Sequence, residues 1–336
     1  MRIAVCRPQV PFVFGGAEIF TDRLVAELRA RDFEAEVVTM PLRTWPNDRL
    51  ATSAMMWRLV DLAEDAERAP DVVIATKFPS YLIRHPNKVV WLVHQFRQAY
   101  ELHETKFGQF SDSPDDRSIR KGIQDLDRES LGEAAKLFAT SENVAQRLER
   151  STGLTAAVLP HPPQELPYRC DRYGEFVLSV GRLDARKRVE MLLHAAALES
   201  AIQVVVVGDG PERARLESMA CDRVRFVGQV GQQELADLYA NCRAVFYAPV
   251  DEDFGMVTFE AFRASKPVVT TSDAGGPLEA VIDGHNGRVI APEPLAVAVA
   301  LRELLANEAL ARALGDRGHE TAATLTWDRS IERLLA

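Results

Sequence analysis

The chain has 336 residues, 47% of them hydrophobic, which is enough for two domains with a substantial core in each. Its formal net charge of −9 argues against general nucleic-acid binding but remains compatible with a local basic pocket for a phosphorylated ligand. No apolar run is long enough to span a bilayer, so a soluble protein is expected. Because the four cysteines form no CxxC pair and no metal-ligand cluster, we expect a reduced, cytoplasmic protein.

In the first half of the chain, short runs rich in Val and Ile alternate with longer helical patterns. Helical spacing of apolar residues is clearest over residues 17–30 and 53–67. Apolar runs that are continuous rather than alternating predict strands buried on both faces, hence a parallel sheet covered by helices. The expected strands are RIAVC, EAEVVT, DVVIA, KVVWLV and KLFAT.

Two places at the carboxyl ends of these strands are candidates for ligand contact. Gly15 and Gly16, within FGGAE, open the helix over 17–30, and their backbone amides could meet a phosphate or an acceptor. His94 follows KVVWLV directly. A single histidine after a strand is often structural, but ligands of open parallel sheets bind at this end of the strands, which favours a functional role.

A segment rich in proline separates the two halves. LPHPPQELPYRCDRYGE carries four prolines and has no periodicity, so we place a domain boundary there, with domains over 1–165 and 166–320. Two parallel sheets that face each other would form a central cleft, a usual location for a substrate.

The second half repeats the alternation of strands and helices. Its helical patterns cover residues 189–199, 211–220 and 232–242. The whole chain is therefore predicted to be α/β, with two Rossmann-like, doubly wound parallel-sheet domains. The expected strands are EFVLSV, IQVVVVG, VRFVG, AVFYAP and PVVTT.

The most informative segment contains two glutamates around Phe254-Gly255. Glu252 follows the strand AVFYAP, and Glu260 lies about one turn into the next helix. Helix-start N–H groups near Gly255 lack intrahelical partners and favour an anion. A phosphate held there would leave one carboxylate for a ribose diol and the other for a sugar hydroxyl. Glutamates near a helix start are also common for purely electrostatic reasons.

A basic loop follows the strand EFVLSV. Arg182 offers a planar guanidinium and Lys187 a mobile ammonium, a combination that suits a diphosphate. The alternative is a solvated basic turn in which Arg186 and Arg188 are further surface charge.

Two other motifs are less specific. Gly208 and Gly210 follow a strong strand and could admit a base or phosphate close to the backbone, although a plain turn explains them equally well. No GxGxxG precedes a ribose-binding acid, which disfavours a nicotinamide enzyme. Asp251 and Asp253 match a metal-binding DxD pattern, but no supporting ligands accompany them, so we expect no metal.

Taken together, these residues resemble the family 4 glycosyltransferases, retaining enzymes of the GT-B fold. The matching pieces are FGGAE, His94 after a strand, VGRLDARKRVEMLLHA, VVVVGDGPERARLE, VRFVGQV, EDFGMVTFEAFRASKPVVTT and GGPLEAVIDGHNGRVI. One departure is Ser265, where a glycine is frequent before Lys-Pro.

The resemblance implies a role for each matching position. Glu260 would hold the nucleotide ribose, and Glu252 would contact the donor sugar. The diphosphate would be held by Arg182 and Lys187, with Phe254, Gly255, Met256 and Val257 in the donor site beside it. His94 would meet the transferred sugar, and Gly16 would lie near phosphate and acceptor. Residues 321–336 would form a helix that packs back on the first domain.

The implied activity is transfer of a hexosyl unit, without metal or cofactor, from GDP-mannose or a UDP-sugar to a glycan or lipid-linked hydroxyl. Surface-polysaccharide biosynthesis is the expected context. Alternatives are a nucleotide-sugar epimerase or phosphorylase of the same fold, or a non-catalytic subunit that binds the nucleotide sugar. The mixed-charge segment 117–130 could be a solvated helix face or make weak contact with the inner face of an anionic membrane.

Overall fold

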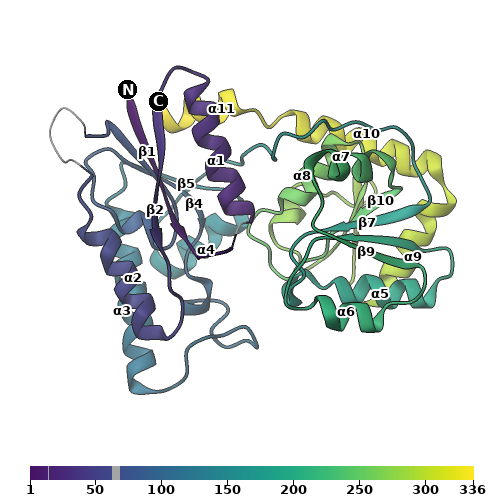
Figure 1. Ribbon diagram of the computed structural model, residues 1–336, viewed down its shortest axis with the longest axis horizontal. Helices are drawn as coiled ribbons and strands as arrows, with labels where there is room; N and C mark the ends of the chain where they lie inside the picture. The colour runs from purple at the N-terminus through teal and green to yellow at the C-terminus, as the bar shows by residue number, and fades with distance from the viewer. Residues whose placement is uncertain (14, 63–68) are drawn as a thin grey trace. The chain divides into compact units, whose positions relative to one another are not determined.

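The computed structural model describes residues 1–13, 15–62 and 69–336, which form two compact units (Figure 1). Unit 1 comprises Met1–His161 and Trp327–Ala336, and unit 2 comprises Pro162–Thr326. The sequence places the boundaries after residues 165 and 320, whereas the units change after 161 and 326. Phe14 of the FGGAE motif lies outside the described residues.

Unit 1 contains a six-stranded parallel sheet with the order β2-β1-β3-β4-β5-β6. The order reverses at β1, because β2 lies on one side of it and β3 on the other. The sequence analysis missed β6, since a strand of two residues carries no pattern. The strands are β1 (Arg2–Gln9), β2 (Glu34–Pro41), β3 (Val72–Lys77), β4 (Lys88–His94), β5 (Lys136–Ala139) and β6 (Ala157–Val158).

Helices cover both faces of this sheet. Successive residues of β3 point to opposite faces, so Val73 and Ala75 pack with α2, α3 and α4, while Ile74 packs with α1 and α11. Figure 1 shows α11 beside α1. The helices are α1 (Gly16–Arg29), α2 (Asn47–Leu59), α3 (Pro114–Gly132), α4 (Glu142–Thr152) and α11 (Trp327–Leu335), with short 3₁₀ turns η1 (Ser80–Leu82) and η2 (Arg97–Ala99).

The prediction of a helix over 53–67 is wrong in its placement. Helix α2 begins earlier, at Asn47, and ends at Leu59, because Val60 is extended with φ −68° and ψ 130°. Residues 63–67 of the predicted helix lie outside the described residues.

Unit 2 repeats the plan with the order β12-β11-β10-β7-β8-β9, again all parallel. Its order reverses between β7 and β10, and ligands of such sheets bind where the order reverses. The strands are β7 (Phe176–Val180), β8 (Gln203–Val207), β9 (Val224–Gly228), β10 (Ala244–Phe246), β11 (Val268–Thr271) and β12 (Gly287–Ile290).

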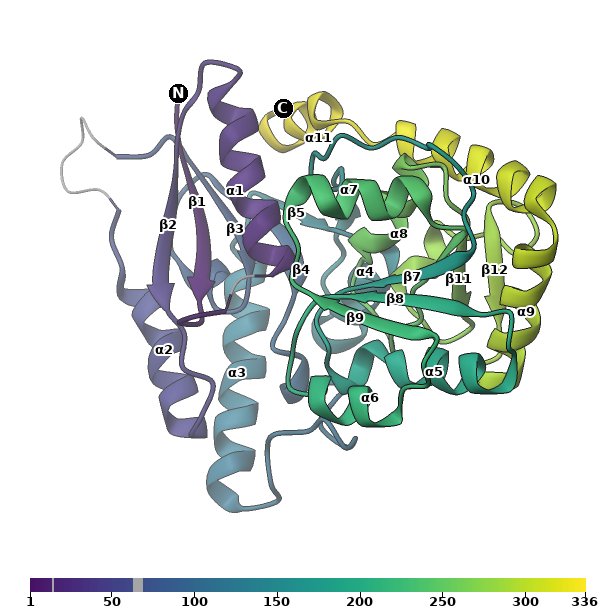
Figure 2. The same ribbon diagram turned by 45° about the vertical axis from the view of Figure 1, so that its right-hand side comes forward.

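Two apolar clusters lie on the two faces of the second sheet. Figure 2 shows α5 and α6 on one side of the strands and α7 and α8 on the other. The doubly wound α/β prediction is thus confirmed for both halves. Within the described residues, no helix is both long and apolar enough to cross a membrane. The helices are α5 (Val189–Leu198), α6 (Arg213–Met219), α7 (Gln232–Asn241), α8 (Met256–Arg263), α9 (Pro294–Ala306) and α10 (Glu308–Ala323), with 3₁₀ turns η3 (Ala185–Lys187) and η4 (Gly276–Glu279).

Candidate functional site

The loops that follow β7 and β10 bring a lysine and a glutamate together where the strand order of unit 2 reverses. The ammonium of Lys187 forms an ion pair with the carboxylate of Glu252, and its Nζ lies 3.3 Å from the hydroxyl of Tyr247. The two side chains are 21% and 20% exposed, so water or a ligand can reach the pair.

The two charges stabilise each other. Burial lowers the pKa of Lys187, but the Glu252 carboxylate together with Tyr247 and Asp184 raises it by more, so the pKa of this ammonium lies above its ordinary value. Burial raises the pKa of Glu252, yet the adjacent Lys187 lowers it below its ordinary value. Both groups are therefore charged at neutral pH.

The start of α8 lies in the same loop as Glu252. Gly255, the residue before the helix, has φ +86°, and a Cβ there would lie 2.7 Å from Cγ of Pro277. Only glycine adopts this conformation without strain and fits this space. Gly255 provides no side-chain cap, so the first-turn amides of Met256 and Val257 are placed to meet an anion. Phe254 instead points into the core, where it stacks on Phe259.

Glu260 lies one turn into α8 and is only 4% exposed. Its Oε2 accepts a hydrogen bond from the hydroxyl of Tyr239 at 2.7 Å, and its Oε1 accepts from Nε2 of Gln164 at 3.1 Å. Burial raises the pKa of Glu260, and these two neutral donors offset that rise only in part. A ribose that binds Glu260 would have to share or displace these donors.

Arg188 joins the loops after β10 and β11. Its guanidinium donates to the carbonyl oxygens of Ala248 and Pro249, at 2.9 and 2.8 Å. It also donates to Thr271 at 2.7 Å and pairs with Asp273 at 2.7 Å. The interpretation of Arg188 as surface charge is wrong, since this side chain fixes the strand ends from which the Glu252 loop departs.

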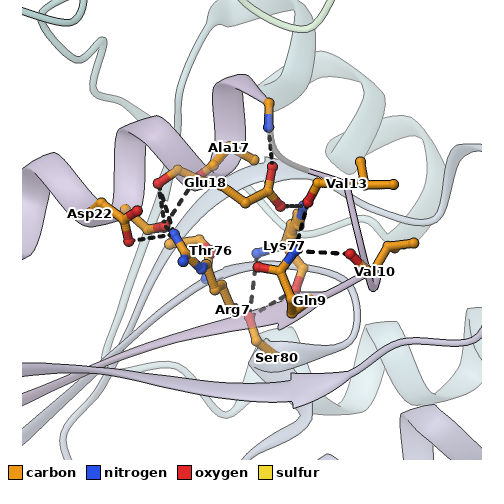
Figure 3. Close-up of polar contacts among 12 residues, drawn as sticks. Arg7, Gln9, Val10, Val13, Ala17, Glu18, Asp22, Thr76, Lys77 and Ser80 are labelled. Atoms are coloured by element: carbon orange, nitrogen blue, oxygen red, sulfur yellow. Dashed lines mark hydrogen bonds and ion pairs between the residues drawn. The ribbon is translucent and has the colours of Figure 1, made fainter. Parts of the chain in front are cut away.

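In unit 1, a second lysine–glutamate pair lies where the strand order reverses at β1. Figure 3 shows Glu18, from the first turn of α1, pointing toward Lys77 at the end of β3, with 2.8 Å between Oε1 and Nζ. The other carboxylate oxygen accepts the Gly15 N–H at 2.9 Å. The guanidinium of Arg7 donates a hydrogen bond of 2.7 Å to the backbone carbonyl oxygen of Glu18. The Gly15 amide is thus already used inside the fold, whereas Gly16 is the first residue of the helix.

His94 is the last residue of β4 and is partly buried. Its Nδ1 lies 2.7 Å from the carbonyl oxygen of Gln95. Because a carbonyl oxygen only accepts, Nδ1 carries a proton in this contact.

Comparison with known proteins places the chain in a family. The model for "Glycosyl transferases group 1" matches residues 171–321. A D-inositol 3-phosphate glycosyltransferase from Geodermatophilus obscurus is 34% identical over 314 residues, which cover 82% of this chain and 68% of that protein. The chain belongs to the group 1 glycosyltransferases, family 4. The resemblance stated from the sequence is therefore confirmed.

Other relatives of this group 1 family member align over differing shares of their length. The lipopolysaccharide core biosynthesis glycosyltransferase LpsE of Rhizobium meliloti is 26% identical over 91% of this chain and 90% of its own. The chain spans 37% of a D-inositol 3-phosphate glycosyltransferase from Streptomyces coelicolor, at 33% identity. It spans 57% of the uncharacterized glycosyltransferase MJ1178 of Methanocaldococcus jannaschii, at 27% identity.

Solved structures of low sequence identity share the fold of this family member. Sucrose-phosphate synthase from Thermosynechococcus elongatus superposes with a TM-score of 0.80 at 21% identity, covering 99% of this chain and 97% of that one. WaaG, a glycosyltransferase involved in lipopolysaccharide biosynthesis, gives 0.71 at 20% identity, covering 98% of both chains. The two six-stranded sheets are those of the GT-B fold.

The structure shows why positions 208 and 210 are occupied by glycine, which the sequence alone did not reveal. A Cβ on Gly208 would lie 1.9 Å from the Gly181 carbonyl oxygen, and one on Gly210 would lie 2.4 Å from that of Leu183. These glycines let the loops after β7 and β8 approach each other, which positions Arg182. The side chain of Arg182 is exposed, and no described residue forms a hydrogen bond or ion pair with its guanidinium.

Several residues at these positions were missed from the sequence. Lys77 ends an apolar strand, DVVIATK, and a lysine there is the signal that could have indicated it. Tyr247, Tyr239 and Gln164 carry no signal, because they reach Lys187 or Glu260 from distant parts of the chain. Within the described residues, no group of three or more His, Cys, Asp or Glu side chains is placed to hold a metal ion.

Proposed function

We propose that this chain is a retaining glycosyltransferase that moves a hexosyl unit from a UDP-sugar or GDP-mannose to a hydroxyl of a glycan or lipid-linked acceptor. The observation that carries the proposal is the Lys187–Glu252 pair beside the start of α8, where the strand order of unit 2 reverses. The relationship to LpsE supports surface-polysaccharide biosynthesis as the context. HepE of Anabaena, 18% identical, was solved with UDP-glucose, so UDP-sugars are the first donors to test.

In this proposal the diphosphate of the donor binds Lys187, Arg182 and the first-turn amides of α8. Lys187 then exchanges one anionic partner for another, so its charge stays compensated when it leaves Glu252. The released Glu252 carboxylate accepts a hydrogen bond from a sugar hydroxyl. Glu260 accepts from the ribose, in place of Gln164 or beside it.

The reaction breaks the bond between the anomeric carbon and the diphosphate oxygen. A bond from the same carbon to the acceptor oxygen forms on the same face, and the acceptor proton passes to the departing diphosphate. Charge grows on that leaving group, and two cations with fixed amides stabilise it electrostatically. No metal is required in this scheme. The resemblance to the family assigns His94 to the transferred sugar and Gly16 to the acceptor.

The test begins with calorimetric titration of UDP, GDP and their sugars, with and without a chelator. We expect one nucleotide family to bind in both conditions, and Lys187→Ala to weaken that binding. Anomeric proton NMR of the reaction with a glycan acceptor should then show a product that retains the donor configuration.

Three outcomes would count against the proposal. Absence of nucleotide binding would overturn the donor site itself. Conversion of the donor without acceptor would indicate an epimerase. Tight binding with no turnover across a panel of acceptors would indicate a non-catalytic subunit.

A further inference from the structure

Unit 1 contains a cavity of about 680 Å³ between α3, α4 and the segment that follows η2. Its lining includes two carboxylates, Glu101 and Asp125. Six cations against two anions leave a local excess of four positive charges, in a chain whose net charge is −9. The six cations are Arg117, Arg120, Lys121, Arg128, Arg147 and Arg150.

Both lining carboxylates already have cationic partners. Asp125 pairs with Lys121 at 2.5 Å. Glu101 pairs with Arg147 at 3.0 Å and with Arg97, from outside the lining, at 2.5 Å. The acidic side chains of the cavity therefore cannot compensate its remaining cations.

Four arginines of the lining form no ion pair with any residue that the structure describes. Arg117 and Arg120 donate to the backbone carbonyl oxygens of Asp112 and Ala99, at 2.5 and 3.0 Å, and these contacts do not neutralise a guanidinium. Arg128 and Arg150 form no hydrogen bond or ion pair with any described residue, and both are exposed. A group that carries two or more negative charges would satisfy this arrangement.

The floor of the cavity is fixed before any ligand arrives. The Tyr100 hydroxyl, on the lining, donates to the fully buried Asp127 at 2.7 Å. Gln95 donates to the same carboxylate at 3.2 Å and accepts from Ser151, also on the lining, at 3.0 Å. A lining that is preorganised by these hydrogen bonds reduces the entropy lost when a ligand binds.

We infer that this cavity binds a phosphate-bearing group, either the headgroup phosphate of a lipid-linked molecule or a soluble phosphate ester. Guanidinium forks match phosphate oxygens two at a time, and four of them suit a dianion better than a single carboxylate. The inference does not depend on the proposed donor site, whose Lys187, Glu252 and α8 lie in unit 2. It gives the basic residues of segment 117–130 a function beyond that of a solvated helix face.

The experiment is calorimetric titration of the full chain with inorganic pyrophosphate and with glycerol 3-phosphate. Arg128→Gln/Arg150→Gln should weaken binding at this site by about tenfold or more, since charge-assisted hydrogen bonds are lost. Arg49→Gln is the matched control, an exposed arginine of α2 outside the cavity, 58% exposed. Arg182→Gln removes a donor-site cation, so the cavity site should persist in that variant. Unchanged thermal unfolding would show that all variants fold.

The source of the phosphate is separated by sedimentation with phosphatidylcholine vesicles that contain phosphatidic acid, whose headgroup phosphate is a monoester, or that lack it. Binding to the phosphatidic acid vesicles that the double variant loses supports the inference with a headgroup as the source. Loss of only the soluble-ester affinity supports it with a soluble source. If the double variant binds both probes as the unaltered chain does, the inference is overturned.

Discussion

Each unit places a lysine–glutamate pair at the point where its strand order reverses, and the two pairs are built differently. In unit 1, Glu18 belongs to the first turn of α1. One of its carboxylate oxygens pairs with Lys77 and the other accepts the Gly15 N–H, so the start of the helix is capped. In unit 2, Glu252 precedes α8 and leaves the helix-start amides open. The side chains of the first pair are 13% and 7% exposed, against 21% and 20% for the second.

The difference shows how one chemistry serves two purposes. When a glutamate caps its own helix, its lysine partner stabilises the fold, because breaking the pair would leave a buried charge without a counter-charge. A glutamate in the loop before the helix leaves a cation, an anion and several amides facing the same space. We therefore expect the unit 1 pair to control stability and the unit 2 pair to control donor chemistry.

The largest expected effect is that of Lys187→Ala on turnover. Removal of one group that stabilises charge on the leaving diphosphate should lower kcat by about a hundredfold to a thousandfold. Arg186→Ala, in the same turn but with its nearest acid 4.0 Å away, is the control and should retain activity. Steady-state kinetics with the donor identified by titration gives the comparison. Full turnover by Lys187→Ala would show that the Lys187–Glu252 pair, like the Lys77–Glu18 pair, does not act on the donor.

The next effect is that of Lys77→Met on stability. The change leaves the Glu18 carboxylate buried without its cation, which should lower the free energy of unfolding by about 3 kcal/mol. Urea unfolding measures this loss, and nucleotide binding by the folded variant should be unchanged. The double variant Lys77→Met/Glu18→Gln should recover part of the lost stability, because no buried charge remains. A single variant as stable as the unaltered chain would contradict a structural role for the unit 1 pair.

A smaller effect, on both turnover and stability, is expected for Arg188→Gln. The change removes the contacts that join the loops after β10 and β11, each worth about 1 kcal/mol or somewhat more for a charged donor. Because Arg188 positions Glu252 rather than contacting the donor, KM for the donor should rise more than kcat falls. Arg186→Gln provides the control. A fall in kcat alone would assign Arg188 to the reacting groups instead.

The sequence predicted the architecture well because the strands are continuous apolar runs that need no tertiary information. It also placed Lys187 and Glu252 at strand ends, but not their contact, since 65 residues separate them. Arg188 was misassigned because the four residues that its side chain contacts lie 60 to 85 residues later in the chain. Gly208 and Gly210 were ambiguous for the same reason: the backbone that requires them belongs to a neighbouring loop.

The smallest expected effects concern the pH dependence of stability. The contributions of two glutamates of unit 2, Glu252 and Glu260, should change with pH in opposite directions. The pKa of Glu252 is lowered from 4.5, so the stability it contributes is present above pH 4.5 and is lost as the pH falls through its folded value. The pKa of Glu260 is raised from 4.5, because burial outweighs its two neutral donors. Its favourable contribution is complete below pH 4.5 and is lost as the pH rises through the folded value.

Urea unfolding of Glu252→Gln and Glu260→Gln from about pH 3 to pH 7 separates these effects. Relative to the unaltered chain, Glu252→Gln should become less stable as the pH rises toward 4.5 and then change little, whereas Glu260→Gln should become more stable as the pH rises above 4.5. The opposite slopes follow from the partners, since Glu252 faces the ammonium of Lys187, whereas the donors to the Glu260 carboxylate, Tyr239 and Gln164, are neutral. Parallel slopes for the two variants would show that burial, and not the cation, sets the charge state of Glu252.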